Sequence, residues 1–131
     1  MIKAVDLATE LSKLTPLVGR SRETTDSEAA AAFSSVAPFG NGAVFIGSFS
    51  GESKWERHSA GDELVQVLDG EAVLTILHED TRTELTLGKG MLTVVPRAHW
   101  HRFNAPKGVT VLTLTPQPTD HSKADDPRQA I

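Results

Sequence analysis

The chain has 131 residues, a length that suits a single domain, and a formal net charge of −4 from 13 basic and 17 acidic side chains. The absence of cysteine excludes disulfides, thiolate metal ligands and a cysteine nucleophile. No basic stripe indicates nucleic-acid binding, and no segment is apolar enough to span a membrane. The N-terminus lacks the apolar core of a signal peptide, so we expect a cytoplasmic protein.

Residues 1–28 are predicted to hold one short helix followed by an irregular arm. Asp6 can cap a helix that runs to Leu14, because Leu7, Leu11 and Leu14 fall on one face at helical spacing. No pair of helices of the DNA-binding kind precedes the rest of the chain. A self-contained transcription regulator is therefore not expected.

Residues 29–116 are predicted to form an all-β sandwich or barrel, because short apolar runs alternate with turn residues every eight to twelve positions. The dipeptide Asp69-Gly70 predicts a hairpin turn, with Ala72–His78 pairing back on Glu63–Leu68. Residues 117–131 are polar and rich in proline and charge, which predicts a flexible tail. The other expected strands are 30–39, 43–50, 55–59, 83–87, 91–95, 100–103 and 109–115.

Several expected strands are apolar on both faces, as in Leu64-Val65 and Val73-Leu74. A sheet with one wet face alternates more cleanly. These strands are therefore expected to be covered inside by the barrel and outside by another element or subunit. A homodimer is predicted on this ground.

Four ionisable residues are the candidate metal ligands: Glu56, His58, Glu63 and His101. Glu56 and His58 lie two apart on an expected strand, so their side chains share a face. Buried carboxylates and imidazoles are costly unless they are paired or bound to metal. Two histidines with two carboxylates suit a divalent ion such as iron, manganese, nickel or zinc.

The segment from Glu56 to Glu63, followed by Gly70, resembles the first motif of the cupin superfamily. That motif has two histidines two residues apart, then a glutamate and a glycine. A second segment with Gly90, Pro96 and His101 resembles the second cupin motif. The resemblance covers roughly residues 40 to 116 and implies a double-stranded β-helix, a jelly-roll barrel with its metal near an open mouth.

Three positions depart from the cupin pattern. Glu56 stands where the first histidine is expected, Ala98 replaces a glycine, and Ala105 replaces an asparagine. The change to Glu56 alters the charge and the ligand count. Without it, two histidines and one carboxylate resemble the facial arrangement of non-haem iron sites. The alternative for Glu56 is an ion pair with Arg57 or Arg97 at the rim.

The resemblance implies a metal-binding protein that binds or transforms a small organic molecule, with dioxygenation and isomerisation as candidate reactions. The absence of tyrosine argues against sugar epimerisation by a tyrosine acid. Arg97 and Arg102 are candidates to hold an anionic substrate. The alternatives are a non-catalytic binding or sensing cupin, an accessory subunit, or a vestigial site that binds no metal.

Overall fold

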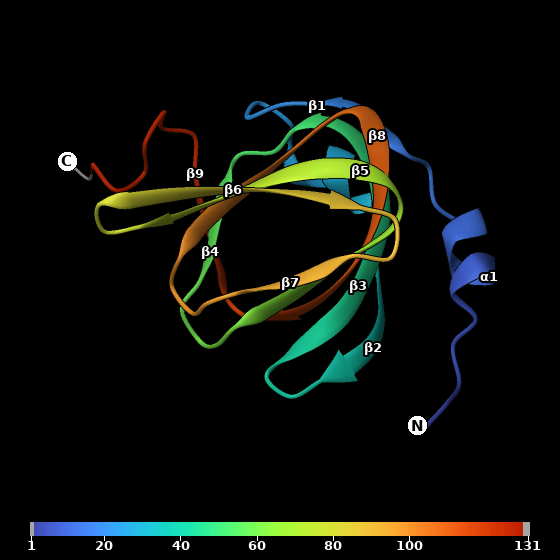
Figure 1. Ribbon diagram of the computed structural model, residues 1–131. Coiled ribbons are helices and arrows are strands. Elements are labelled where there is room, and N and C mark those ends of the chain that lie inside the picture. Colours follow the sequence, from blue (N-terminus) through green and yellow to red (C-terminus); the bar gives the residue numbers. More distant parts are fainter. Residues whose placement is uncertain (1, 130–131) are drawn as a thin grey trace.

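The computed structural model describes residues 2–129, which are mostly β-strand (Figure 1). Two short helices lie in the N-terminal part, α1 at Leu7–Ser12 and α2 at Asp26–Ala30. Within the described residues one hydrogen-bonded sheet curls into a barrel. Its strands are β1 (Leu17–Arg20), β2 (Phe33–Phe39), β3 (Gly42–Glu52), β4 (Trp55–His58), β5 (Glu63–His78), β6 (Thr81–Gly88), β7 (Leu92–Val95), β8 (Trp100–Pro116) and β9 (Thr119–Ser122).

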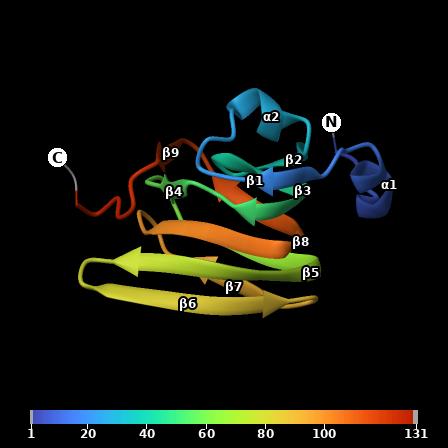
Figure 2. The same cartoon turned by 90° about the horizontal axis from the view of Figure 1, so that it is seen from above.

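The long strands β5 and β8 form the middle of the barrel. They pair antiparallel from Leu64 with Leu114 to Leu77 with Trp100. Viewed from above, β5, β6, β7 and β8 make one layer, and β1, β2 and β3 lie above it (Figure 2). This arrangement confirms the predicted all-β barrel with a short N-terminal helix.

The hairpin predicted at Asp69-Gly70 is wrong, because β5 runs through this dipeptide as one strand from Glu63 to His78. The register against β8 shifts on either side of it, so the dipeptide marks bulges at which the strand bends. Gly70 has a φ of 77°, and a side chain there would meet the backbone of Gly108, whose φ is 97°. These two glycines let the long strands bend together and close the barrel.

The N-terminal arm is more ordered than its polar sequence indicates. The predicted helix is confirmed, with the Asp6 side chain accepting hydrogen bonds from the backbone of Ala8 and Thr9. The segment predicted as irregular contains α2, which begins with a capping box between Thr25 and Glu28. Residues 17–20 form β1, a strand parallel to β3.

Part of the segment predicted as a flexible tail forms β9, which pairs with β4. Beyond β9, the backbone oxygen of Asp125 accepts a hydrogen bond from Trp55 Nε1. Arg128 donates to the backbone oxygens of His78, Glu79 and Thr81 at the β5–β6 turn. Local polarity did not reveal these contacts because all of them join the tail to distant parts of the chain.

The hydrophobic core is built from side chains of β3 and of β5 to β8. Its largest members are Phe49, Leu74, Leu87 and Phe103, which are buried together with valines of β5, β7 and β8. Tight packing of this kind holds the strand ends in fixed positions. Within residues 2–129, neither helix has the length and apolar character that crossing a bilayer requires.

Candidate metal centre

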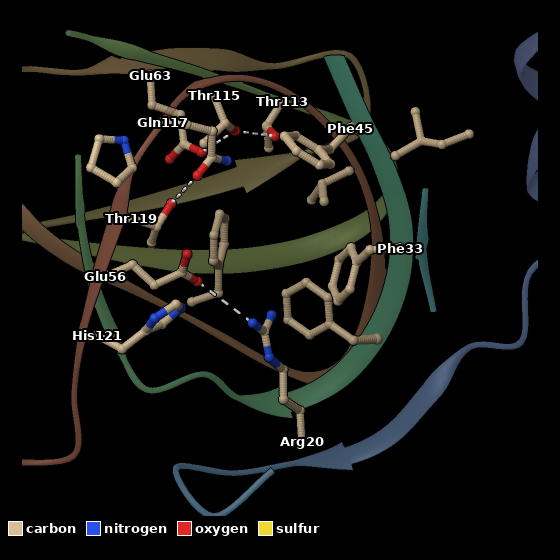
Figure 3. A pocket seen from close by; sticks show the side chains of 15 residues that line it. Arg20, Phe33, Phe45, Glu56, Glu63, Thr113, Thr115, Gln117, Thr119 and His121 are labelled. Atoms are coloured by element: carbon tan, nitrogen blue, oxygen red, sulfur yellow. Dashed lines mark hydrogen bonds and ion pairs between the residues drawn. The ribbon is translucent and has the colours of Figure 1, made fainter. Parts of the chain in front are cut away.

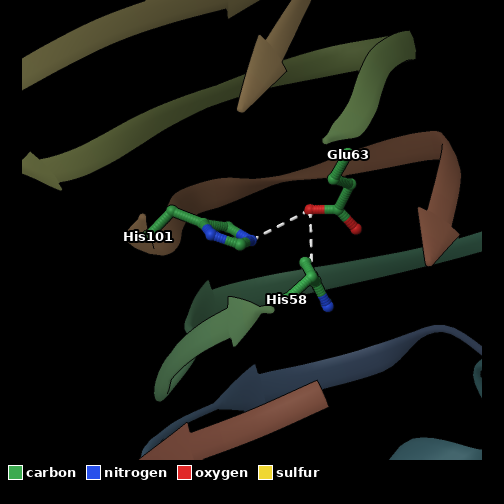
Figure 4. Close-up of side chains that lie close together, drawn as sticks. All are labelled: His58, Glu63 and His101. Carbon is green, nitrogen blue, oxygen red and sulfur yellow. Dashed lines mark ion pairs between the residues drawn. The ribbon is translucent and has the colours of Figure 1, made fainter. Parts of the chain in front are cut away.

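Three predicted ligands meet inside the barrel (Figure 4). His58 ends β4, Glu63 begins β5 and His101 lies near the start of β8. Oε1 of Glu63 is 3.4 Å from His58 Nε2 and 2.9 Å from His101 Nε2. All three side chains are buried. The group joins residues 58–63 to His101, two segments that are far apart in the sequence.

The atoms that face one another lack well-directed hydrogen bonds. His58 Nε2, Glu63 Oε1 and His101 Nε2 are fully buried, and no partner within residues 2–129 satisfies the direction that a hydrogen bond requires. The 2.9 Å approach of Glu63 to His101 is therefore a close charge contact whose N–H direction is poor. Buried polar atoms left in this state are rare in proteins and call for an explanation such as a bound ion.

The opposite edge of each side chain is held by a second polar group. His101 Nδ1 donates to the backbone oxygen of His99 over 3.1 Å, which leaves a lone pair on Nε2 in the neutral ring. His58 Nδ1 lies 3.0 Å from Thr119 Oγ1. Partners of this kind fix the orientation of metal-binding side chains.

The carboxylate of Glu63 is oriented in the same way from β8. Its Oε2 accepts a hydrogen bond of 2.6 Å from Thr115 Oγ1, and that hydroxyl lies 2.7 Å from Thr113 Oγ1. The hydrogen bond leaves Oε1 facing the two imidazoles. Two imidazole nitrogens and one carboxylate oxygen are a donor set that suits iron, manganese, nickel or zinc, so these residues fit the predicted metal.

The pKa values of Glu63 and His101 are shifted by their surroundings. Burial alone would raise the pKa of Glu63, but contacts with His101 and His58 outweigh it and lower that pKa to about 2. Burial lowers the pKa of His101, but the Glu63 carboxylate outweighs it and leaves that pKa raised. Without metal, a proton on the His101 imidazole therefore balances the charge of the Glu63 carboxylate, a role that a bound cation would otherwise fill.

The fourth predicted ligand, Glu56, lies apart from this group. It pairs with His101 in the β4–β8 ladder, but its Oε1 is 3.5 Å from Arg20, and its side chain faces a cavity. Glu56 forms its ion pair with Arg20 rather than with Arg57 or Arg97, and Arg57 pairs with Asp120.

The two arginines considered for an anionic substrate lie outside the metal group. So does His99, whose ring stacks on that of His78 with 4.4 Å between centroids. Arg102 lies over Trp55 and forms an ion pair with Glu52, so it does not line the cavity. The backbone N–H of Arg97 donates to Asp62, which ties the turn after β7 to the start of β5.

That turn explains one departure from the cupin pattern. Ala98 has a φ of 64°, a left-handed conformation that glycine adopts without strain and other residues rarely adopt. Its N–H donates to the backbone oxygen of His58 over 2.9 Å. The turn thus joins the strands that carry His58 and His101. Alanine at position 98 adopts the left-handed conformation with backbone strain that glycine would avoid.

A cavity of about 500 Å³ opens beside the metal group (Figure 3). Phenylalanines line one side, and the polar side includes Glu56, Glu63, Thr113, Thr115 and Thr119. Phe103 belongs to the hydrophobic core and also lines the cavity. The remaining lining residues are Arg20, Phe33, Phe45, Ile46, Phe49, Val111, Gln117, Pro118 and His121.

Sequence reasoning missed Arg20, Thr119 and His121. Arg20 lies in the arm predicted as irregular, and the other two lie in the predicted tail. His121 lies directly opposite Glu56 in the β4–β9 ladder. That pairing becomes visible only when the tail is known to return to β4.

The family model described as Cupin domain matches residues 49–115, and the chain belongs to this family. The match contains His58, Glu63 and His101 together with Glu56, but it excludes Arg20, Thr119 and His121. A search of curated proteins gave no match.

Solved structures share the fold at low sequence identity. A cupin-2 domain containing protein from Shewanella frigidimarina is 18% identical, with a TM-score of 0.62 over 86% of this chain and 94% of that one. Protein NMB1881 from Neisseria meningitidis is 13% identical, with a TM-score of 0.64 over 92% and 100%. Hydroquinone 1,2-dioxygenase PnpCD, crystallised with Cd²⁺ and 4-hydroxybenzonitrile, is 20% identical, with a TM-score of 0.55 over 64% and 63%.

Proposed function

We propose that this protein is a metal-dependent cupin that binds and transforms a small organic molecule in the cavity beside His58, Glu63 and His101. One observation carries the proposal. Three buried atoms face one point without well-directed hydrogen bonds, while the far side of each residue is held by another group. Such an arrangement is expected of ligands prepared for a divalent cation.

The bound ion would polarise an oxygen atom of the organic molecule, and a redox-active ion would in addition support dioxygen chemistry. The residues of the chain position the metal ligands and the organic molecule. Thr119 and Thr115 orient His58 and Glu63, and the phenylalanine wall excludes water from one side of the molecule. Glu56 faces the same cavity and is the carboxylate available to accept a proton.

Dioxygenation and isomerisation are the reactions we propose first. The metal-bound dioxygenase PnpCD has the same fold, which supports the first of them as a hypothesis to test. A non-catalytic binding or sensing cupin is the alternative, and it would keep both the metal and the ligand. A cytoplasmic location and a homodimer remain predictions from the sequence.

Elemental analysis of the purified protein tests the proposal directly. We expect close to one divalent metal per chain, either as isolated or after reconstitution with Fe²⁺, Mn²⁺, Ni²⁺ or Zn²⁺. A chain that holds no metal under both conditions would have a vestigial site, and the proposal would fail. Turnover of carbonyl and phenolic compounds by the iron-loaded protein then separates an enzyme from a binding module.

A further inference from the structure

The side chain of Arg20 places a positive charge in the cavity. Arg20 precedes residues 49–115, the segment that matches the family model. Its side chain is 13% exposed, and its guanidinium lies 5.2 Å from the centre of the Phe33 ring and 4.7 Å from that of Phe49. In Figure 3, Arg20 and Glu63 enter the cavity from opposite edges. Contact with two aromatic rings holds the guanidinium in place, as cation–π pairs do.

The hydrogen-bonding capacity of Arg20 is largely unused. A guanidinium carries five N–H donors. Across residues 2–129, its ion pair is the 3.5 Å contact with Glu56, and its side chain makes no closer hydrogen bond. Burial lowers the pKa of Arg20, and the charge of Glu56 offsets part of that effect. An arginine side chain stays charged in proteins. Among residues 2–129, Glu56 supplies the balancing charge but leaves most of the five N–H donors unused.

The wall beside Arg20 is aromatic. Phe33 and Phe49 meet at 5.9 Å between ring centres, and Phe49 meets Phe103 edge-on at 5.7 Å. Phe45 lines the same cavity. A cavity of about 500 Å³ with an apolar wall and few polar groups has the character of a small-molecule site.

We propose that this cavity takes a monoanionic aromatic carboxylate, with its carboxylate on Arg20 and its ring against the phenylalanine wall. The charges agree with this assignment. Arg20 and a divalent cation would carry three positive charges against the two negative charges of Glu56 and Glu63, so the cavity as a whole has one surplus positive charge, which one anion neutralises. The inference rests on the proposed function, because the ligand would share the cavity with the metal.

Gly51 explains how Arg20 reaches this position. In the parallel β1–β3 pairing, Arg20 lies opposite Gly51, which has a φ of 96°. A side chain at Gly51 would collide with the backbone oxygen of Arg20. Glycine therefore allows β1 to lie against β3, and the close approach delivers the arginine to the cavity.

The test is calorimetric binding of 3-phenylpropanoate and its neutral amide, 3-phenylpropanamide, to the full chain, both zinc-loaded and freed of metal with EDTA. We expect the acid to bind roughly tenfold or more tightly than the amide, the difference that one hydrogen-bonded charge pair provides. Arg20→Gln should abolish the preference, and Arg20→Lys should retain part of it. Arg102→Gln, which removes an arginine outside the cavity, is the matched control and should leave it unchanged.

Glu56→Gln adds a measurement that does not require the loss of Arg20. Removing the competing carboxylate should tighten binding of the acid several-fold and leave the amide unaffected. Equal binding of acid and amide by the natural chain, or a preference that survives Arg20→Gln, would overturn the inference. If the preference depends on Arg20 but the protein never binds metal, the proposed function is contradicted and the inference about Arg20 still holds.

Discussion

Glu63 and His101 meet inside the barrel at 2.9 Å, although 37 positions separate them in the chain. The contact joins the first residue of β5 to a residue near the start of β8. A carboxylate and an imidazole buried this deeply must be neutralised, either by a shared proton or by a cation. A proton and a metal ion therefore compete for the same site.

Replacing His58 or His101 with alanine should abolish metal binding. Each change removes one of three buried donor atoms, which should cost more than the roughly 10–100-fold typical of losing an outer partner. Glu56→Gln is the matched comparison, because Glu56 faces the cavity but pairs with Arg20. Isothermal titration with Zn²⁺ measures all three variants. A loss for Glu56→Gln as large as that for His58→Ala would make Glu56 a full ligand.

Much of this site was predictable from sequence, because strand alternation and motif spacing together indicate His58, Glu63 and His101. The bend at Gly70 was not predictable, since a glycine after an aspartate fits a hairpin equally well. Arg20 and Thr119 were missed for another reason. Each reaches the cavity through pairing with a strand far away in sequence, and no local pattern records such pairing.

Thr115→Val should weaken metal binding by roughly 10–100-fold without unfolding the protein. The substitution preserves the shape of the side chain but removes the 2.6 Å hydrogen bond that orients the Glu63 carboxylate. Thr110→Val is the control, because its hydroxyl also lies on β8 but pairs with Ser48 outside the cavity. Zinc titrations that give the same affinity for both variants would show that Thr115 plays no orienting part.

The metal-free protein should lose stability as the pH rises through the raised pKa of His101. The pKa of His101 is raised in the folded state, so its contribution is complete below the unfolded value near 6.5 and is lost as the pH passes the folded value. The pKa of Glu63 is lowered to about 2, so its contribution is present above about 4.5 and lost in acid.

Metal binding follows the opposite trend, because the cation needs a deprotonated imidazole. The rise in Tm caused by Zn²⁺ should therefore be larger at about pH 8 than at about pH 6. Thermal unfolding with EDTA and with Zn²⁺ at both values measures this difference. The exposed His78 is the control, and His78→Ala should preserve the trend. A zinc effect that does not change with pH would contradict proton displacement at this site.

A homodimer, predicted from strands that are apolar on both faces, has a candidate surface on the outside of the barrel. Val94 pairs with Leu64, which pairs in turn with Leu114, and Val94 is 48% exposed. Leu92 beside them is 54% exposed. Val94→Glu should convert a dimer to a monomer in light scattering, while Thr83→Glu on β6 should not. A natural chain that is monomeric at high concentration would rule the dimer out.

Ala98→Gly should stabilise the protein, because glycine adopts the observed φ of 64° without the strain that alanine bears. The left-handed conformation costs roughly 1–2 kcal/mol for an L-residue, and the greater freedom of glycine in the unfolded chain offsets part of that gain. Urea unfolding should therefore show a rise of about 1 kcal/mol or less. Ala98→Val should lower stability, since a β-branched side chain is more strained there. Ala105→Gly is the control at the other alanine departure, where the buried methyl group packs in the core, so glycine should destabilise.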